Sequence, residues 1–182
     1  MPNRFTKGRG LFGALNVPLS GLRIADVAVN ASAAELNTLA AASTAAPAYS
    51  SEVTFTETTG AGVYTGSVVV PAGATILDIQ IRSTAVWTAT TSATMKVGDT
   101  DDDGWYTGID LKATDLLVGE VIRFASTGGK EGVYIVTASG LLNTSYSASA
   151  RTIAGIVTTV GGAGNAGRTR MLVTYTLPTA TA

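Results

Sequence analysis

The residues best suited to chemistry are the acidic ones of the stretch DTDDDGWYTGID, which runs from Asp99 to Asp110. Four of the 13 acidic residues in the chain lie between Asp99 and Asp103. Such crowding of like charge raises the free energy unless a cation neutralises the carboxylates or water solvates them fully. The stretch therefore indicates a metal site, a pair of catalytic carboxylates or an exposed turn.

The spacing within the stretch fits a calcium-binding loop. It follows the pattern D-x-D-x-D-G with an acidic twelfth position, where Asp replaces the usual Glu. Carboxylate oxygens suit Ca²⁺, the glycine allows a sharp turn, and a backbone carbonyl supplies a further ligand. The predicted ligands are Asp99, Asp101, Asp103, the carbonyl of Trp105, and Asp110. The competing interpretation, which we favour, is a solvated β-turn in which Asp and Gly supply the turn chemistry.

Catalysis by these carboxylates is not expected. The chain has no His and no Cys, which excludes Ser–His and Cys–His nucleophiles and any imidazole or thiolate metal site. A glycosidase needs two carboxyl groups roughly 5–10 Å apart, one of them kept protonated by an apolar setting. Neighbouring Asp residues on one hydrophilic turn lack that asymmetry, so we predict that the protein is not an enzyme.

The elements that must position this stretch are short strands, which begin near Glu52. In EVTFTET, apolar and polar residues alternate with the period of a half-buried strand. Gly, Pro, Asn or Asp clusters separate further candidate strands at 62–73, 75–84, 86–98, 121–126, 132–139, 151–160 and 168–177. About eight strands, with at most one short helix near 111–117, predict an all-β fold, an antiparallel β-sandwich with a jelly-roll-like topology.

The strand at 75–84 has the clearest two-sided pattern. One face is predicted to carry Leu77, Ile79 and Ile81, and the other Ile76, Asp78, Gln80 and Arg82.

The composition along the chain predicts three regions: an extended basic arm over 1–30, a short helix and linker over 31–50, and the β-sandwich domain over 51–182.

The arm is distinguished by its charge. Its first 25 residues carry four basic side chains and no acidic one, so this segment is +4 while the rest of the chain is −5. Gly and Pro exclude a continuous helix there, yet many side chains are apolar, so we expect the arm to be ordered by docking onto a protein partner or onto its own domain. Basic residues without interleaved aromatics are a weak nucleic-acid signal. The predicted contact residues are Arg4, Lys7, Arg9, Leu11, Phe12, Leu15, Leu22 and Arg23.

The segment NASAAELNTLAAAS, residues 30–43, predicts one short helix. Ser32 is a suitable N-cap, and Glu35 three residues later completes a capping box. Leu36 and Leu39 form an apolar edge. A helix of this length is marginal alone in water, so packing within or between subunits must hold it.

The overall composition points to association rather than to a membrane. Charged residues make up 14% of the chain, against roughly 25% in typical soluble domains. Low charge favours association because little repulsion keeps copies apart. The chain contains no run of about 18 apolar residues, so no transmembrane helix is predicted. The N-terminal stretch superficially resembles a signal peptide, but Asn16 and Pro18 interrupt its apolar part.

Several motifs resemble those of tailed-bacteriophage virion proteins. SAAELNTL is similar to an AAELN-x-L element of phage fibre and head-fibre proteins, where it forms a short helix or a trimerising turn. The segments VVVPAGATILDIQIRSTAVW, MKVGDTDDDGWYTGIDL and GNAGRTRMLVTYTLP resemble parts of small phage virion proteins. The resemblance covers most of residues 30–178. Unlike long fibres, the chain has no internal repeat, which favours a compact part bound to the capsid.

The resemblance implies a capsid decoration protein, of the cement or head-fibre-base type, on the capsid surface of the virion and made in the host cytoplasm. Its implied partners are the major capsid protein, through the arm, and itself as a homo-oligomer, a trimer joined partly through Leu36 and Leu39. The resemblance implies no nucleic acid, membrane or cofactor, and Ca²⁺ is suggested only by the spacing of the acidic stretch. One alternative is a tail-tip or fibre adhesion module that binds host-surface glycans through Trp87, Trp105 and Tyr106. Another is a secreted bacterial carbohydrate-binding domain.

Overall fold

A computed structural model describes residues 23–24, 27–28, 47–60, 62–112, 114–136, 138–162 and 164–178. The chain divides into two units, Met1–Ala45 and Ala46–Ala182. In the first unit, β1 (Arg23–Ile24) and β2 (Val27–Ala28) form an antiparallel pair. The other predicted arm contacts, the helix at 30–43, and Leu36 and Leu39 lie outside the described residues.

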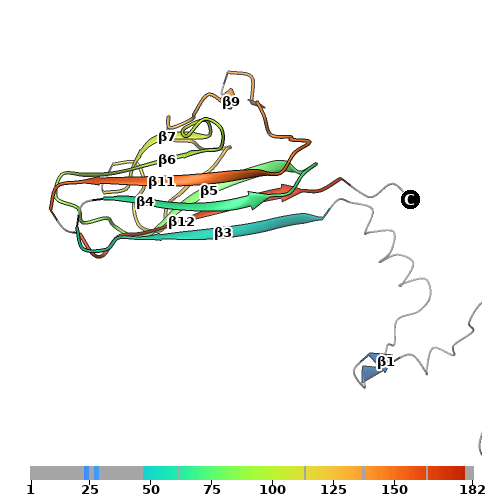
Figure 1. The fold of residues 1–182 in the computed structure, drawn as a ribbon, viewed down its shortest axis with the longest axis horizontal. Coiled ribbons are helices and arrows are strands. Elements are labelled where there is room, and N and C mark those ends of the chain that lie inside the picture. The colour runs from blue at the N-terminus through green and yellow to red at the C-terminus, as the bar shows by residue number, and fades with distance from the viewer. Residues whose placement is uncertain are drawn as a thin grey trace, which may run out of the picture. The chain divides into compact units, whose positions relative to one another are not determined.

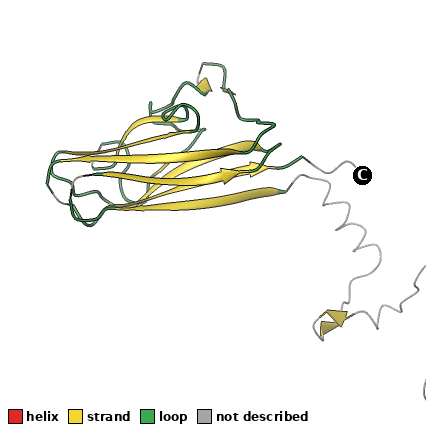
Figure 2. Cartoon of the chain, in the orientation of Figure 1, coloured by secondary structure: helices red, strands yellow, loops and turns green. Residues whose placement is uncertain are grey.

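The second unit, called the body below, is a sandwich of two four-stranded antiparallel sheets (Figures 1 and 2). The β3 sheet has the order β3 (Ala48–Thr56), β12 (Arg168–Thr176), β5 (Thr75–Ala85) and β8 (Val121–Ile122). The β4 sheet has the order β4 (Val63–Val70), β11 (Arg151–Val160), β6 (Ser92–Gly98) and β7 (Tyr106–Asp110).

This strand order is that of a jelly roll. When the eight sandwich strands are numbered along the chain, the two sheets read 1-8-3-6 and 2-7-4-5. Between the sixth and seventh of them, β9 (Ile135–Val136) and β10 (Leu141–Leu142) form a small separate hairpin. The predicted all-β sandwich with jelly-roll topology is therefore confirmed.

The core lies between the sheets, because successive side chains of a strand point to opposite faces. Inward-facing residues of both sheets form one buried apolar cluster, which includes Phe55, Ile79, Ile81, Met95, Val97, Ile153, Val157, Met171 and Val173. Burial of this apolar surface holds the two sheets together.

A glycine pair shapes the middle of this core. Gly66 in β4 lies directly opposite Gly155 in β11, and the ring of Phe55 from the β3 sheet packs against both. A methyl group on Gly155 would lie 2.5 Å from Cζ of Phe55 and 2.8 Å from Cε of Met95. The two glycines therefore leave a hollow in the β4 sheet that the Phe55 ring fills.

The predicted two-sided pattern of the strand at 75–84 is only partly right. Ile79 and Ile81 are buried as predicted, but Leu77 is exposed and Ile76 is buried. The pairing with β12 skips a residue here, and a β-bulge of this kind reverses the inside–outside alternation on one side of it. The prediction for Leu77 and Ile76 was wrong for that reason.

Other local predictions also differ from the structure. Residues 86–91, predicted as part of a strand, form a loop that leads into β6. Residues 106–110, which the sequence assigns to the acidic stretch, form β7. The described residues around 111–117 form turns and irregular structure, which agrees with the prediction of at most one short helix there. No helix within the described ranges has the length and apolar character to cross a membrane.

Candidate binding surfaces

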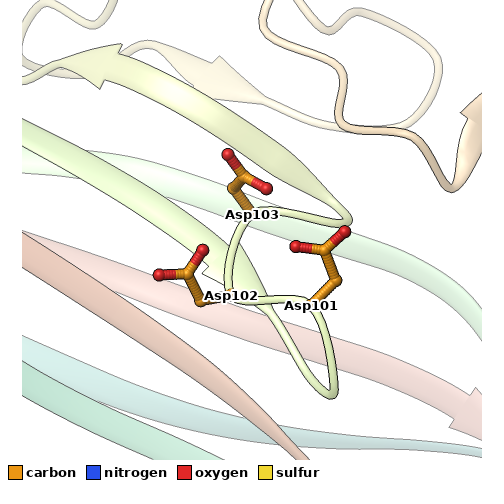
Figure 3. Close-up of side chains that lie close together, drawn as sticks. All are labelled: Asp101, Asp102 and Asp103. Atoms are coloured by element: carbon orange, nitrogen blue, oxygen red, sulfur yellow. The ribbon is translucent and has the colours of Figure 1, made fainter.

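The acidic stretch begins as the turn between β6 and β7 (Figure 3). The carbonyl of Asp101 accepts hydrogen bonds from the amides of Asp99 (3.0 Å) and Gly104 (3.2 Å), which closes the turn. The amide of Trp105 then donates to the carbonyl of Val97 at 2.9 Å, and strand pairing resumes. A Cβ on Gly104 would lie 2.1 Å from the Tyr134 ring, so the glycine is needed for this close approach.

Three carboxylates gather on the tip of this turn. Oxygens of Asp101, Asp102 and Asp103 lie within 4.8 Å of one another, and the first two residues are exposed. Lys96 contacts both carboxylate oxygens of Asp102 at 3.3 Å, and Thr107 donates to Asp103 at 3.3 Å. Water and Lys96 therefore offset the repulsion between the three charges.

Asp99 lies away from this tip and pairs with Arg151 at the start of β11. Its carboxylate accepts from the Thr100 amide at 2.6 Å and lies 3.4 Å from the Arg151 guanidinium. The Arg151 guanidinium also donates to the carbonyls of Thr144 and Ser145. The two charged side chains are only 10% and 12% exposed, so the pair fixes the turn and the loop before β11 to each other.

The remaining predicted ligands also have partners in the protein. The carbonyl of Trp105 accepts from the Gly132 amide at 2.8 Å. Asp110 lies at the far end of β7, where its carboxylate accepts from the Lys112 amide (2.7 Å) and the Thr114 hydroxyl (2.9 Å). Of the five predicted ligands, the structure brings only Asp101 and Asp103 together, with Asp102 beside them. The solvated turn stays the favoured prediction, with calcium binding as its untested alternative.

We expect the melting temperature of the protein to be the same in excess Ca²⁺ and in excess EGTA. Four of the five ligands that a calcium loop would use, Asp99, Asp103, the Trp105 carbonyl and Asp110, accept hydrogen bonds within the protein, and the fifth, Asp101, is exposed to water. Circular dichroism at increasing temperature measures this, with Asp103→Ala as the matched variant. A melting temperature that falls in EGTA for the wild type, but not for Asp103→Ala, would show that the turn does hold calcium.

A buried carboxylate that the sequence did not single out joins two loops. Glu57 follows β3 and is only 2% exposed. Its Oε1 accepts from the amide of Ala89 at 2.8 Å, and its Oε2 accepts from the amides of Thr88 and Gly167, both at 2.9 Å. The Thr88 hydroxyl and the Ala166 amide also donate to Oε2.

These hydrogen bonds determine the charge state of Glu57. Burial acts to raise its pKa, but the bonds from Thr88, Gly167 and Ala89 outweigh burial, and the pKa lies below its ordinary value. Among the described residues, its hydrogen-bond partners are backbone amides and one hydroxyl, and none is a cationic side chain. Glu57 is therefore an anionic clasp that holds residues 88–89 and 166–167 together, and not a proton donor or acceptor for a substrate.

The aromatic residues assigned to glycan binding in the alternative function are part of the core. Trp87, Trp105 and Tyr106 are all fully or almost fully buried. The Trp87 indole donates to the Thr169 hydroxyl at 2.8 Å, and the Tyr106 hydroxyl donates to the carbonyl of Ile79 at 2.7 Å. Their rings are not available to stack on a sugar, so the glycan alternative loses the residues on which it depended.

The outer face of the β3 sheet carries ion pairs, whereas the part of the other outer face that β4 and β11 form carries no charge. On the β3 sheet, Glu52 forms ion pairs with Arg170 (3.1 Å) and Arg82 (3.9 Å). The outward-facing side chains of β4 and β11 on the other sheet are instead small or β-branched and uncharged, and they include Thr65, Ser67, Val69, Thr152, Ala154 and Ile156. This face suits contact with another uncharged protein surface.

An open pocket of about 420 Å³ lies beside the small β9–β10 hairpin. Its lining is mostly apolar and includes Leu77, Phe124, Ile135, Leu141 and Leu142. None of the lining residues is titratable, so the pocket has no group for acid–base or nucleophilic catalysis.

No protein-family model matches the chain, and neither does any curated protein sequence. Three solved structures of phage capsids contain similar chains. The chain in the acid-stable capsid of Helicobacter pylori bacteriophage KHP30 is 19% identical over 72% of this chain and 89% of that one, with a TM-score of 0.39. In cyanophage Pam1 the identity is 22% over 74% and 86% of the two chains (TM-score 0.45), and in Ralstonia phage GP4 it is 18% over 74% and 86% (TM-score 0.45).

Proposed function

We propose that this chain is a structural protein of a bacteriophage virion, a capsid decoration protein whose basic arm binds the major capsid protein. One contrast between the arm and the body carries the proposal. The buried or half-buried carboxylates of the body, such as Glu57, Asp99 and Asp110, are engaged by its own backbone and by Arg151. The first 25 residues, in contrast, carry a charge of +4 without a single acidic residue.

Three further observations support a structural role rather than an enzymatic or glycan-binding one. The resemblance of the sequence motifs to phage virion proteins covers most of residues 30–178. The body has an uncharged outer face on β4 and β11. The apolar pocket beside β9 and β10 has no titratable lining, and the aromatics of the glycan alternative are buried.

In the proposed mechanism, the arm contributes both apolar burial and charge. Leu11, Phe12, Leu15 and Leu22 would bury apolar surface on the capsid, and Arg4, Lys7, Arg9 and Arg23 would face acidic groups there. Leu36 and Leu39 would join three copies, so that three arms bind as one unit. Because such a trimer binds the assembled shell and not its free subunits, it stabilises the shell by mass action.

Deletion of residues 1–25 tests the arm directly. We expect the shortened chain to keep the melting temperature of the body, because the jelly roll begins at Ala48, but to lose co-sedimentation with capsids that lack this protein. A matched control is the full chain with Lys in place of Arg4, Arg9 and Arg23, which keeps the charge and should still bind. Full occupancy of capsids by the shortened chain would contradict the proposal.

A further inference from the structure

The edges of a β-sheet present unpaired backbone groups, and natural proteins protect them against pairing with other chains. Three of the four sandwich edges in the described body are protected. At one of them, β8 is only two residues long. At β7, the Thr107 amide donates to the carbonyl of Lys130 at 2.9 Å, and Glu131 forms a bridge to Tyr106. β3 carries the charged residue Glu52 on its outer face.

The fourth edge, β4, has none of these protections. Its sequence, VYTGSVVV, has eight residues without a charge or a proline, and its register with β11 is continuous. Val63 and Val69 on its outer face are 63% and 65% exposed. Within the described ranges, no strand pairs with its free side and no backbone hydrogen bond is made there. This edge is therefore open to pairing.

The register identifies which backbone groups are free. The Thr159 amide donates to the carbonyl of Gly62 at 2.9 Å, so these two residues form a hydrogen-bonded pair just beyond the end of β4. Hydrogen-bonded and non-hydrogen-bonded pairs alternate along an antiparallel ladder. The even-numbered residues of β4 therefore bond to β11. The amides and carbonyls that point to the free edge belong to Val63, Thr65, Ser67 and Val69.

We propose that the β4 edge is an interface with a second copy of this chain, in which two β4 strands pair antiparallel across a two-fold axis at Gly66. In this register, Val63 lies opposite Val69 of the second copy, and Thr65 lies opposite Ser67. In each copy, the amides and carbonyls of all four residues that face the free edge then bond to the second copy, which gives eight backbone hydrogen bonds. Apolar side chains meet apolar ones and hydroxyl groups meet hydroxyl groups on the outer face.

A second copy suits this edge better than an unrelated partner. A two-fold interface requires a patch that is complementary to itself, and an antiparallel strand pair meets this condition in its backbone. The eight residues carry no charge, so two copies do not repel each other. A single edge-to-edge contact buries less than the roughly 800 Å² per partner of a standard interface. It therefore acts where copies already lie side by side at high local concentration; if the proposed function holds, a two-fold contact of this kind joins neighbouring trimers on the capsid.

Disulfide trapping of the full chain tests the pairing, since the chain has no cysteine of its own. Hydrogen-bonded antiparallel pairs have Cα atoms about 5.5 Å apart, within the range that a disulfide spans. A mixture of Thr65→Cys with tagged Ser67→Cys should, on mild oxidation at high protein concentration, give the mixed dimer in at least several-fold higher yield than Thr65→Cys with tagged Val69→Cys. Equal yields from the two mixtures, or no mixed dimer in either, would overturn the proposal.

A proline variant provides a second measurement that needs no oxidation. The Ser67 amide faces the free edge, so Ser67→Pro leaves the ladder to β11 intact but removes a donor from the interface. We expect Ser67→Pro to lower the average mass at high concentration in sedimentation velocity, relative to Ser67→Thr, at a similar melting temperature. Unchanged self-association of Ser67→Pro would contradict the pairing. Binding of Ser67→Pro to capsids tests the arm separately, because the arm is intact in this variant.

Discussion

Replacing Glu57 with Gln lowers the free energy of unfolding by about 3–5 kcal/mol. The carboxylate is 2% exposed and accepts hydrogen bonds from four backbone amides and one hydroxyl, with donors at both oxygens. A Gln side chain in the same place must direct its NH₂ group at amides that also donate. At least one buried amide then loses its partner, which costs about 1–3 kcal/mol, and the hydrogen bonds that remain lose the added strength of a charged acceptor, which brings the total to about 3–5 kcal/mol.

Glu52→Gln is the matched control for this variant. Glu52 lies five residues earlier in the same segment, and its carboxylate forms only surface ion pairs with Arg170 and Arg82. Such pairs contribute about 0–1 kcal/mol, so Glu52→Gln should change stability little. Urea denaturation followed by tryptophan fluorescence measures both variants. Equal losses for Glu57→Gln and Glu52→Gln would show that the clasp contributes nothing beyond a surface carboxylate.

The same clasp makes part of the stability depend on pH. Because the folded protein holds the Glu57 pKa below its ordinary value, the charged form favours folding. This contribution is present above the ordinary pKa near 4.5 and is lost as the pH falls through the folded-state pKa. The difference in urea midpoint between wild type and Glu57→Gln should therefore be largest near neutral pH and should shrink below about pH 4.5.

Sequence patterns predicted those parts of the fold that depend on neighbouring residues. Alternation of apolar and polar residues in 52–58 predicted β3, and the clusters of turn residues around 151–160 and 168–177 predicted β11 and β12. The clasp could not be predicted in this way, since the partners of Glu57 lie 31 to 110 residues away in the chain. The bulge at Leu77 likewise depends on how β5 pairs with β12, and the alternation of apolar and polar residues in 75–84 does not indicate it.

The acidic stretch shows how burial can override a spacing motif. A calcium loop would need residues 99–110 to curl around one ion. In the structure the chain instead enters β7 after Gly104, which buries Trp105, Tyr106 and Ile109 in the core. Burial of side chains of this size contributes several kcal/mol and carries Asp110 to the far end of the strand, away from the acidic tip. The carboxylate spacing alone contained no information about this competing demand.

Replacing Phe55 with Ala lowers the free energy of unfolding by about 3–5 kcal/mol, because it empties the hollow that Gly66 and Gly155 leave in the opposite sheet. Gly155→Val alone should also destabilise the protein, by about 1–3 kcal/mol, because its new methyl groups meet the Phe55 ring. The two changes should compensate each other when they are combined.

In the double variant Phe55→Ala with Gly155→Val, the valine occupies space that the phenylalanine ring has left. We expect the loss to be smaller than the sum of the two single losses by at least about 1 kcal/mol, a coupling typical of residues in direct contact. Phe55→Ala combined with Val69→Ala, on the outer face of β4, is the control and should be additive because the two side chains lie on opposite sides of the β4 sheet. Urea denaturation of the wild type, the three single variants and the two double variants gives both double-mutant cycles. Additivity in the first cycle would mean that the glycine pair and the ring do not determine how closely the two sheets pack.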